Sequence, residues 1–508
     1  KEGVHFDTPS YYKRMTVNKS NNTIQAAWVA LGSLFAFGFS IVSSIILSRY
    51  FDKTDYGTYK QVIYVYHTLL IVFTLGLPKT YSYFLPRTND CYVKSLVKKI
   101  TTVFYILGAL FSFSLFFFSP QLAKILNNPD LELALKVFSP VPFILLPTMG
   151  IEGIFATYNK NKYMALYNVV SKSFILICIC CSVIVLEGNY LTAIVGFTIA
   201  SLISLLFANY LKHRCLRDKG SAPTLVSFKE IIKFSIPLLR ASIWGLLLGN
   251  CTSYFISRYF GTKVFAEFSN GALELPFVGM IVNACSTVLL PFFSQKNYES
   301  VNAKDEILIV WKNAFEKTIK LTYPLVMFFC FYSYDVMEFL YGAQYHISGL
   351  YFRIMLISSF FTVIAYAPIL IAIGATSFFS RVHFVGACCV IVLQYTSILL
   401  FNSSFVVTAI YVVCNGVMIV SMLLYITKYF NTHISTIIPF KTVGLITVIS
   451  FVLSWVTKLF SNNIPVLNNS LQVIMVSFAL YFFIYLIASN IFRIDYSYVM
   501  KLFSFNKK

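Results

Sequence analysis

Long apolar runs separated by short polar segments fill most of this chain. A helix needs about 20 mostly apolar residues to cross a bilayer, and runs of about that length recur about fourteen times. The predicted spans are 24–47, 62–84, 100–118, 137–158, 169–186, 190–210, 234–260, 273–293, 321–340, 351–373, 382–401, 405–426, 443–459 and 471–491. The pattern predicts an all-α integral membrane protein with about fourteen transmembrane helices.

The composition agrees with a membrane protein. The chain is 58% hydrophobic and only 12% charged, and a soluble fold would have to bury too much of this apolar surface. The formal net charge of +20 is spread over the short segments between runs. This distribution favours loops that face an anionic lipid leaflet and argues against a nucleic-acid-binding domain.

The positions of the basic residues predict the orientation. With the N-terminus inside, the outer segments hold only Arg49, Lys53, Lys60, Lys124, Lys136, Arg258, Lys263, Arg353 and Lys458. Most of the other basic residues then lie inside, as the positive-inside rule requires. Both termini are therefore predicted to be cytoplasmic.

One tetrapeptide, Ser-Arg-Tyr-Phe, closes two of the apolar runs, at 48–51 and at 257–260. Both copies fall at the outer end of a predicted span, the first and the seventh. An even number of spans returns the chain to the same side of the membrane. The two halves are therefore predicted to be parallel repeats related by an axis along the membrane normal.

The repeat predicts two six-helix lobes followed by two C-terminal helices. The predicted parts are a cytoplasmic N-terminal segment at 1–23, an N-lobe at 24–210, a cytoplasmic linker at 211–233, a C-lobe at 234–426, and spans thirteen and fourteen with a cytoplasmic tail at 427–508. A Gly-Ser-Ala-Pro stretch beside a dense basic cluster indicates the linker.

Several short motifs surround the two tetrapeptides. Arg-Tyr-Phe at 49–51 is followed by Asp-Tyr-Gly-Thr-Tyr at 55–59, and the second half has Arg-Tyr-Phe-Gly at 258–261 and Leu-Tyr-Gly-Ala-Gln-Tyr at 340–345. In these motifs the chain resembles the Wzx-type polysaccharide flippases, which share the MOP superfamily with MATE exporters and the lipid II flippase MurJ. It departs from the family pattern at 265–268, where Phe-Ala-Glu-Phe replaces a tyrosine-bearing turn.

The resemblance implies a flippase without catalytic activity. Such a protein carries an undecaprenyl-pyrophosphate-linked oligosaccharide from the inner to the outer leaflet of the bacterial cytoplasmic (inner) membrane, for surface polysaccharide biosynthesis. It works by alternating access through a cleft between its two lobes. Its partners are then the lipid-linked glycan, membrane lipids and, as a further candidate, a polysaccharide polymerase.

A cationic patch in such a cleft would attract the pyrophosphate. Arg240 is the first candidate, because it lies within the seventh span, where a charged side chain costs about 2.5 to 3.5 kcal/mol. Alternatively, the Arg240 side chain extends to the lipid phosphates at the inner end of the span. Arg49 and Arg258 could clamp the headgroup or anchor the interface, and Lys79 could reach the cleft or act as a positive-inside residue.

Glu152 is the acidic residue placed well inside a predicted span. It could pair with Arg240, bind a coupling H⁺ or Na⁺, or lie at the inner mouth beside Lys160 and Lys162. A MATE-like ion-coupled exporter of small molecules is the alternative function, and it would favour acidic residues in the cleft.

Other chemistry finds little support in the sequence. The cysteines fall mostly inside apolar runs at spacings that fit no zinc site, and the histidines are scattered, so no metal and no cofactor are expected. A phosphate-binding glycine-lysine loop is absent from the sequence, so the energy source is not ATP hydrolysis by this chain. A membrane polymerase would need a larger outer loop with an acid and a base, so an enzyme is disfavoured.

Overall fold

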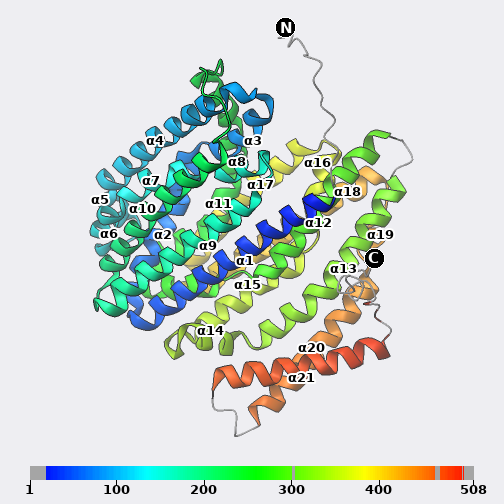
Figure 1. The fold of residues 1–508 in the computed structure, drawn as a ribbon. Coiled ribbons are helices and arrows are strands. Elements are labelled where there is room, and N and C mark those ends of the chain that lie inside the picture. Colours follow the sequence, from blue (N-terminus) through cyan, green and yellow to red (C-terminus); the bar gives the residue numbers. More distant parts are fainter. Residues whose placement is uncertain (1–18, 300–303, 464–468, 493, 495, 497–508) are drawn as a thin grey trace.

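The computed structural model describes residues 19–299, 304–463, 469–492, 494 and 496. In this part of the chain every regular element is a helix, which confirms the predicted all-α class (Figure 1). Nine of the described helices are long and apolar enough to cross a membrane, or ten if one bent pair at Lys53–Thr74 and Leu77–Arg87 forms a single span. The protein is thus a multi-pass membrane protein, and the count of fourteen stays a prediction.

We use "first half" for the helices from α1 to α10. They are α1 Lys19–Tyr50, α2 Lys53–Thr74, α3 Thr80–Phe84, α4 Val93–Phe117, α5 Ser119–Ile125, α6 Asp130–Phe138, α7 Pro140–Leu145, α8 Ile151–Thr157, α9 Asn161–Cys180 and α10 Tyr190–Cys215. Short 3-10 helices lie between them at η1 Leu77–Lys79, η2 Leu85–Arg87, η3 Asp90–Tyr92 and η4 Leu146–Thr148, and a π-helical turn, η5 Cys181–Val185, follows α9.

The "second half" runs from α11 to α18, and three further helices follow it. They are α11 Phe228–Gly271, α12 Pro276–Glu299, α13 Lys304–Phe331, α14 Ser333–Tyr341, η6 Ala343–Tyr345, α15 Ser348–Thr362, α16 Ala367–Ala372, α17 Thr376–Phe401, α18 Ser404–Phe430, α19 Ile434–Ile437, α20 Phe440–Asn462 and α21 Ser470–Ile491. Figure 1 shows α20 and α21, in orange to red, at one edge of the molecule. The predicted boundaries of the lobes stay a prediction.

The two halves repeat the same packing scheme. In the first half α1 packs on α9 and α9 packs on α10, and in the second half α11 packs on α17 and α17 packs on α18. The two tetrapeptides occupy equivalent places in this scheme. Ser48 and Ser257 are fully buried, whereas Tyr50 and Tyr259 are 45% and 44% exposed. The sequence repeat therefore corresponds to a structural repeat.

Local signals in the sequence set the start and the bend of α11. Ser227 and Glu230 form a capping box, in which the Ser227 side chain accepts from the Glu230 N–H and the Glu230 carboxylate accepts from the Ser227 N–H. The helix is interrupted at Gly261, whose φ of 81° and ψ of 177° are not helical. Only glycine adopts such a conformation readily, so the span ends directly after the second tetrapeptide.

The predicted ninth span at 321–340 is wrong in its boundaries. The helix α13 begins at Lys304 and ends at Phe331, and α14 is a separate helix. The N-terminal part of α13 carries Lys312, Glu316 and Lys320, which lowered its apparent hydropathy. The C-terminal end of the predicted span belongs to α14, which contains Asp335 and Glu338.

The most extensive contact between the halves is made by α2 and α11. A Cβ atom on Gly57 would lie 2.3 Å from the carbonyl oxygen of Thr262, so no larger residue fits there without movement. Buried polar side chains also cross this interface. The Tyr56 hydroxyl donates to Asn270 over 2.6 Å, and the Gln61 amide donates to Ser257 over 2.7 Å.

Candidate functional site: a cationic cavity in the first half

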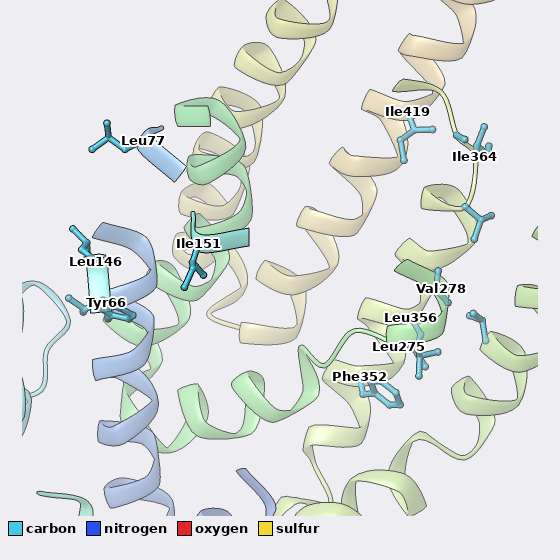
Figure 2. Packing of buried hydrophobic residues seen from close by; sticks show 14 of the residues in the cluster. Tyr66, Leu77, Leu146, Ile151, Leu275, Val278, Phe352, Leu356, Ile364 and Ile419 are labelled. Carbon is cyan, nitrogen blue, oxygen red and sulfur yellow. The ribbon is translucent and has the colours of Figure 1, made fainter. Parts of the chain in front are cut away.

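A cavity of about 470 Å³ lies among the helices of the first half, bounded by residues of α1, α2, α8, α9 and α10. Its charged or titratable lining side chains come from three of these helices and are Lys60, His67, Glu152 and Lys172. Figure 2 shows Tyr66 and Ile151, which line this cavity, near Leu146 on the first-half helices, and a second buried group with Leu275 and Phe352 in the second half.

The two lysines give the cavity its cationic character. The Lys60 amine donates to the Ser44 hydroxyl over 3.1 Å and lies 5.2 Å from the centre of the Tyr56 ring. Within the described residues, Lys172 has no recorded hydrogen bond or ion pair. Because a charge inside a membrane helix costs about 2.5 to 3.5 kcal/mol, two amines held there are a strong indication of a functional site.

The rest of the lining suits a polar ligand with a ring. Hydroxyl and amide groups come from Ser40, Ser43, Ser44, Thr148, Asn168, Ser171 and Ser204, and aromatic rings come from Tyr59, Tyr66, Tyr167 and Phe197. Hydroxyl and amide side chains can donate and accept hydrogen bonds, and aromatic rings offer apolar faces. Such a mixture is typical of sites that bind small polar molecules.

The structure brings one of the predicted site residues to this cavity. Glu152 lines it, lies in the first turn of α8 and is exposed. Its neighbour in the cavity wall, Pro78, is adjacent to Lys79, which is exposed at the end of η1. The cavity therefore reaches the end of the molecule at which Lys79 lies.

Arg49 and Arg258 lie elsewhere, away from this cavity. The Arg49 guanidinium donates to the carbonyls of Phe339 and Leu340, and Arg258 donates to the carbonyl of Lys124 over 2.9 Å. Each arginine thus contacts the opposite half of the molecule. Their predicted role as headgroup clamps stays untested.

The side chain of Arg240 lies outside the described residues, although its backbone belongs to α11. The prediction that it faces the passage, and its pairing with Glu152, therefore stay predictions. Among the described residues, no ion pair is recorded for Glu152.

Two smaller cavities lie in other parts of the molecule. One of about 260 Å³ is located between α2 and α11 and is mostly apolar apart from Thr68, Asn250 and two tyrosines. The Thr68 hydroxyl and the Tyr64 hydroxyl both bond to Asn250, over 3.2 Å each. The other, of about 220 Å³, lies in the second half and is lined by Glu274, Asn283 and Asn415 among others.

Sequence reasoning missed Lys60 and Lys172. Lys60 was assigned to an outer loop because the second span was predicted to begin at 62, whereas α2 already begins at Lys53. Lys172 lies in the middle of α9, within the fifth predicted span at 169–186. A lysine three residues inside the predicted run at 169–186 was a usable signal, since charged residues are rare within membrane spans.

Comparison with known proteins places this arrangement in context. A family model described as "Polysaccharide biosynthesis protein" matches residues 24–296. The lipopolysaccharide biosynthesis protein WzxC of Escherichia coli (strain K12) is 24% identical over 282 residues, which are 53% of this chain and 54% of that protein. The chain thus spans about half the length of this curated relative.

Solved structures share the fold at low sequence identity. The lipid II flippase MurJ in an inward closed conformation matches with a TM-score of 0.70 and 16% identity, over 91% of this chain and 98% of that one. A multidrug resistance MATE family transporter of the MOP superfamily, in an inward-facing conformation, matches with a TM-score of 0.63 and 13% identity, over 77% of this chain and 94% of that one.

Proposed function

Because the chain belongs to the polysaccharide biosynthesis protein family, we propose that it is a flippase that moves an undecaprenyl-pyrophosphate-linked oligosaccharide from the inner to the outer leaflet. The resemblance to Wzx-type flippases is confirmed by the family match and by the relative. The fold it shares with MurJ is that of a multi-pass membrane transporter.

The observation that carries the proposal is the pair of amines, Lys60 and Lys172, inside a cavity of membrane helices. A pyrophosphate on a lipid carrier is anionic and cannot cross hydrocarbon alone. An attraction between unit charges 4 Å apart is worth about 1 kcal/mol in water and about 4 kcal/mol at an effective dielectric constant of 20. The two amines would therefore hold a pyrophosphate, and the serines and tyrosines around them would contact the first sugar.

Transport in proteoliposomes tests this proposal. A fluorescent lipid-linked oligosaccharide is reconstituted with the protein, and its arrival in the outer leaflet is followed by a quencher. We expect Lys60→Met with Lys172→Met to reduce the rate at least ~10-fold, the factor that corresponds to a loss of about 1.4 kcal/mol. Lys98→Gln, which removes an exposed charge outside the cavity, should leave the rate unchanged. A full rate in the double variant would contradict the role of the amines.

Arg240 belongs to the same proposal. If its guanidinium adds to the cationic passage, Arg240→Ala should abolish transport at unchanged membrane expression, whereas Arg240→Lys should retain part of it. The outcome does not depend on Lys60 or Lys172, so each site is tested separately. Full transport by the alanine variant would remove Arg240 from the mechanism.

The location of Glu152 on the cavity wall favours a second candidate, a MATE-like exporter of cationic small molecules coupled to H⁺ or Na⁺. One carboxylate faces two amines in this cavity, so we rank this candidate second. Export of a cationic dye from the same liposomes, lost in Glu152→Gln and retained without lipid-linked sugar, would favour it over the flippase.

The remaining parts of the proposal concern the membrane and the energy source. We place the protein in a bacterial cytoplasmic membrane with both termini inside, following the basic residues. Transport by alternating access would use an ion gradient, the membrane potential or the substrate gradient. Collapsing each gradient in turn in the proteoliposomes identifies the source. Binding of a polysaccharide polymerase is tested by co-purification from the membrane.

A further inference from the structure

We propose that Arg49 and Arg258 form a paired latch that closes the two halves against each other at one end of the molecule. The latch is a property of the fold and does not depend on what the protein carries. In this structure both arginines are engaged, so the molecule is closed at this end. Opening the passage on this side would require the arginines to release their partners.

The first part of the latch joins α1 to α14. Arg49 lies in the last turn of α1, and its Nε donates to the Leu340 carbonyl over 3.2 Å while its Nη2 donates to the Phe339 carbonyl. These carbonyls are in the last turn of α14, where helical carbonyls lack partners within their own helix. A planar guanidinium can meet two such carbonyls at once.

The second part joins the end of the α11 span to α5. Arg258 lies three residues before the bend at Gly261, and its Nη1 donates to the Lys124 carbonyl over 2.9 Å. Lys124 is in the last turn of α5. A positive charge near the C-terminal end of a helix is favourable, which holds for both arginines.

The two parts are equivalent by the internal repeat. α5 directly follows α4 in the first half, and α14 directly follows α13 in the second half. Each arginine ends the first span of its half and binds the short helix of the other half. Two such crosswise contacts resist separation of the halves more evenly than one. This arrangement gives the repeated tetrapeptide a role that lipid anchoring alone does not explain.

Neighbouring contacts also join the second half to the first half at this end. The Gln344 amide donates to the Ser48 carbonyl over 2.8 Å, and the Tyr345 ring packs edge-to-face on Tyr56 at 5.7 Å between ring centres. The motif at 340–345 therefore docks on the end of α1 and the start of α2. Two motifs that looked unrelated in the sequence thus form opposite sides of one contact.

The latch has the energy expected of a reversible contact. Its hydrogen bonds lie at the exposed rim of the interface, where water can replace the carbonyls. A hydrogen bond that exchanges with water makes only a modest net contribution to stability. An open state in which water replaces these contacts is therefore accessible and can be selected by a ligand.

The test measures opening directly, without substrate. Spin labels are attached at Leu133→Cys and Ile347→Cys, two exposed positions at this end on opposite halves, in a variant whose 11 cysteines are replaced. Electron-spin measurements in nanodiscs then give the distance between the two labels. The protein with both arginines is compared with the double variant Arg49→Gln, Arg258→Gln. We expect a second, longer distance population in the double variant and smaller populations in the single variants.

A matched control is Lys263→Gln, which removes an exposed positive charge of the second half close to Gly261. It should keep the wild-type distances. An unchanged distribution in the arginine double variant, or equal opening in the Lys263 variant, overturns the latch. If the double variant fails to fold, Arg49→Gln and Arg258→Gln are measured singly instead, and wild-type distributions in both also overturn it. Transport by the protein plays no part in these outcomes.

Discussion

The motif at 55–59, in the first turns of α2, shows how single residues hold the two halves together. The Asp52 side chain caps α2 by accepting from the Asp55 N–H over 2.7 Å, which fixes the start of the helix. Tyr56 is then fully buried and reaches Asn270 of the other half. Gly57 allows the backbones of α2 and α11 to approach. The family motif is therefore a packing motif at the interface of the halves.

Gly57→Ala should weaken this interface. The added methyl would lie 2.3 Å from the Thr262 carbonyl oxygen, so α2 and α11 must move apart. Overpacking of this kind typically costs about 1 to 3 kcal/mol. Thermal unfolding in detergent should show a lower midpoint than wild type. Gly245→Ala is the control, because a Cβ there meets no heavy atom within 4 Å, and an equal loss in both variants would refute the argument.

Gln61 connects two other polar side chains inside the interface. Its Nε2 donates to Ser257 over 2.7 Å, and its Oε1 accepts from the Asn128 amide over 2.6 Å. Gln61→Leu leaves the Ser257 hydroxyl without this buried partner, which costs about 1 to 3 kcal/mol. The free energy of unfolding should fall by that amount, whereas Gln121→Leu on the exposed face of α5 should change it by less than ~0.5 kcal/mol.

At the scale of the elements, the apolar pattern predicts most helices but not where charges lie within them. The runs at 190–210 and 405–426 correspond to α10 and α18 because both are uniformly apolar. The start of α2 could not be predicted, since its first turns hold the charged residues Lys53, Asp55 and Lys60, and the partners of the two lysines lie in other helices. Hydropathy treats these charges as loop residues, although the fold surrounds them with polar groups.

The sequence predicts a cationic passage between the two lobes, and this stays a prediction, whereas the described cavity lies within the first half. Arg240, Arg49 and Arg258 were chosen for this passage because they stood out along the chain. The lysines of the cavity come from α2 and α9, and only folding brings these helices together. One sequence does not reveal which distant residues lie close together in the fold. It does reveal the repeated tetrapeptide, because a repeat can be seen without knowing any contacts.

An ion pair links α20, one of the C-terminal helices, to the second half. This pair could not be predicted from the sequence. Lys458 of α20 contacts Asp335 of α14 over 2.6 Å, with side chains 24% and 20% exposed, and its amine lies 4.8 Å from the centre of the Tyr332 ring. Asp335, which lies within the predicted span at 321–340, thus binds α20. The same α14 receives Arg49 at its other end.

A double-mutant cycle measures this anchor. Lys458→Gln and Asp335→Asn, alone and together, should give a coupling free energy near the upper end of about 0.2 to 1 kcal/mol, because the pair is shielded more than most surface pairs. Unfolding in a denaturant titration supplies the four values. The exposed pair Lys136 and Glu132, four residues apart on α6, is the reference and should couple by about 0.3 to 0.5 kcal/mol. Equal or smaller coupling at α20 would contradict an anchoring role.

At the scale of the whole molecule, the two halves are joined where α1 ends and α2 begins. The Lys53 amine and the Glu267 carboxylate lie 2.5 Å apart across the halves, with 27% and 15% of their side chains exposed. The same region contains both arginines and the 340–345 motif. A protein that works by alternating access must separate these contacts in each cycle, so preventing their separation should stop transport.

Cross-linking tests this requirement. Lys53→Cys and Glu267→Cys, in a variant without the native cysteines, place two thiols across the halves in reach of a short cleavable bis-thiol reagent. The cross-linked protein should lose transport of the lipid-linked oligosaccharide, and cleavage of the linker should restore it. Glu132→Cys with Lys136→Cys, within α6, is the matched control, because a link inside one helix leaves the halves free. If transport continues when positions 53 and 267 are linked and stops when positions 132 and 136 are linked, the two halves do not separate at this end.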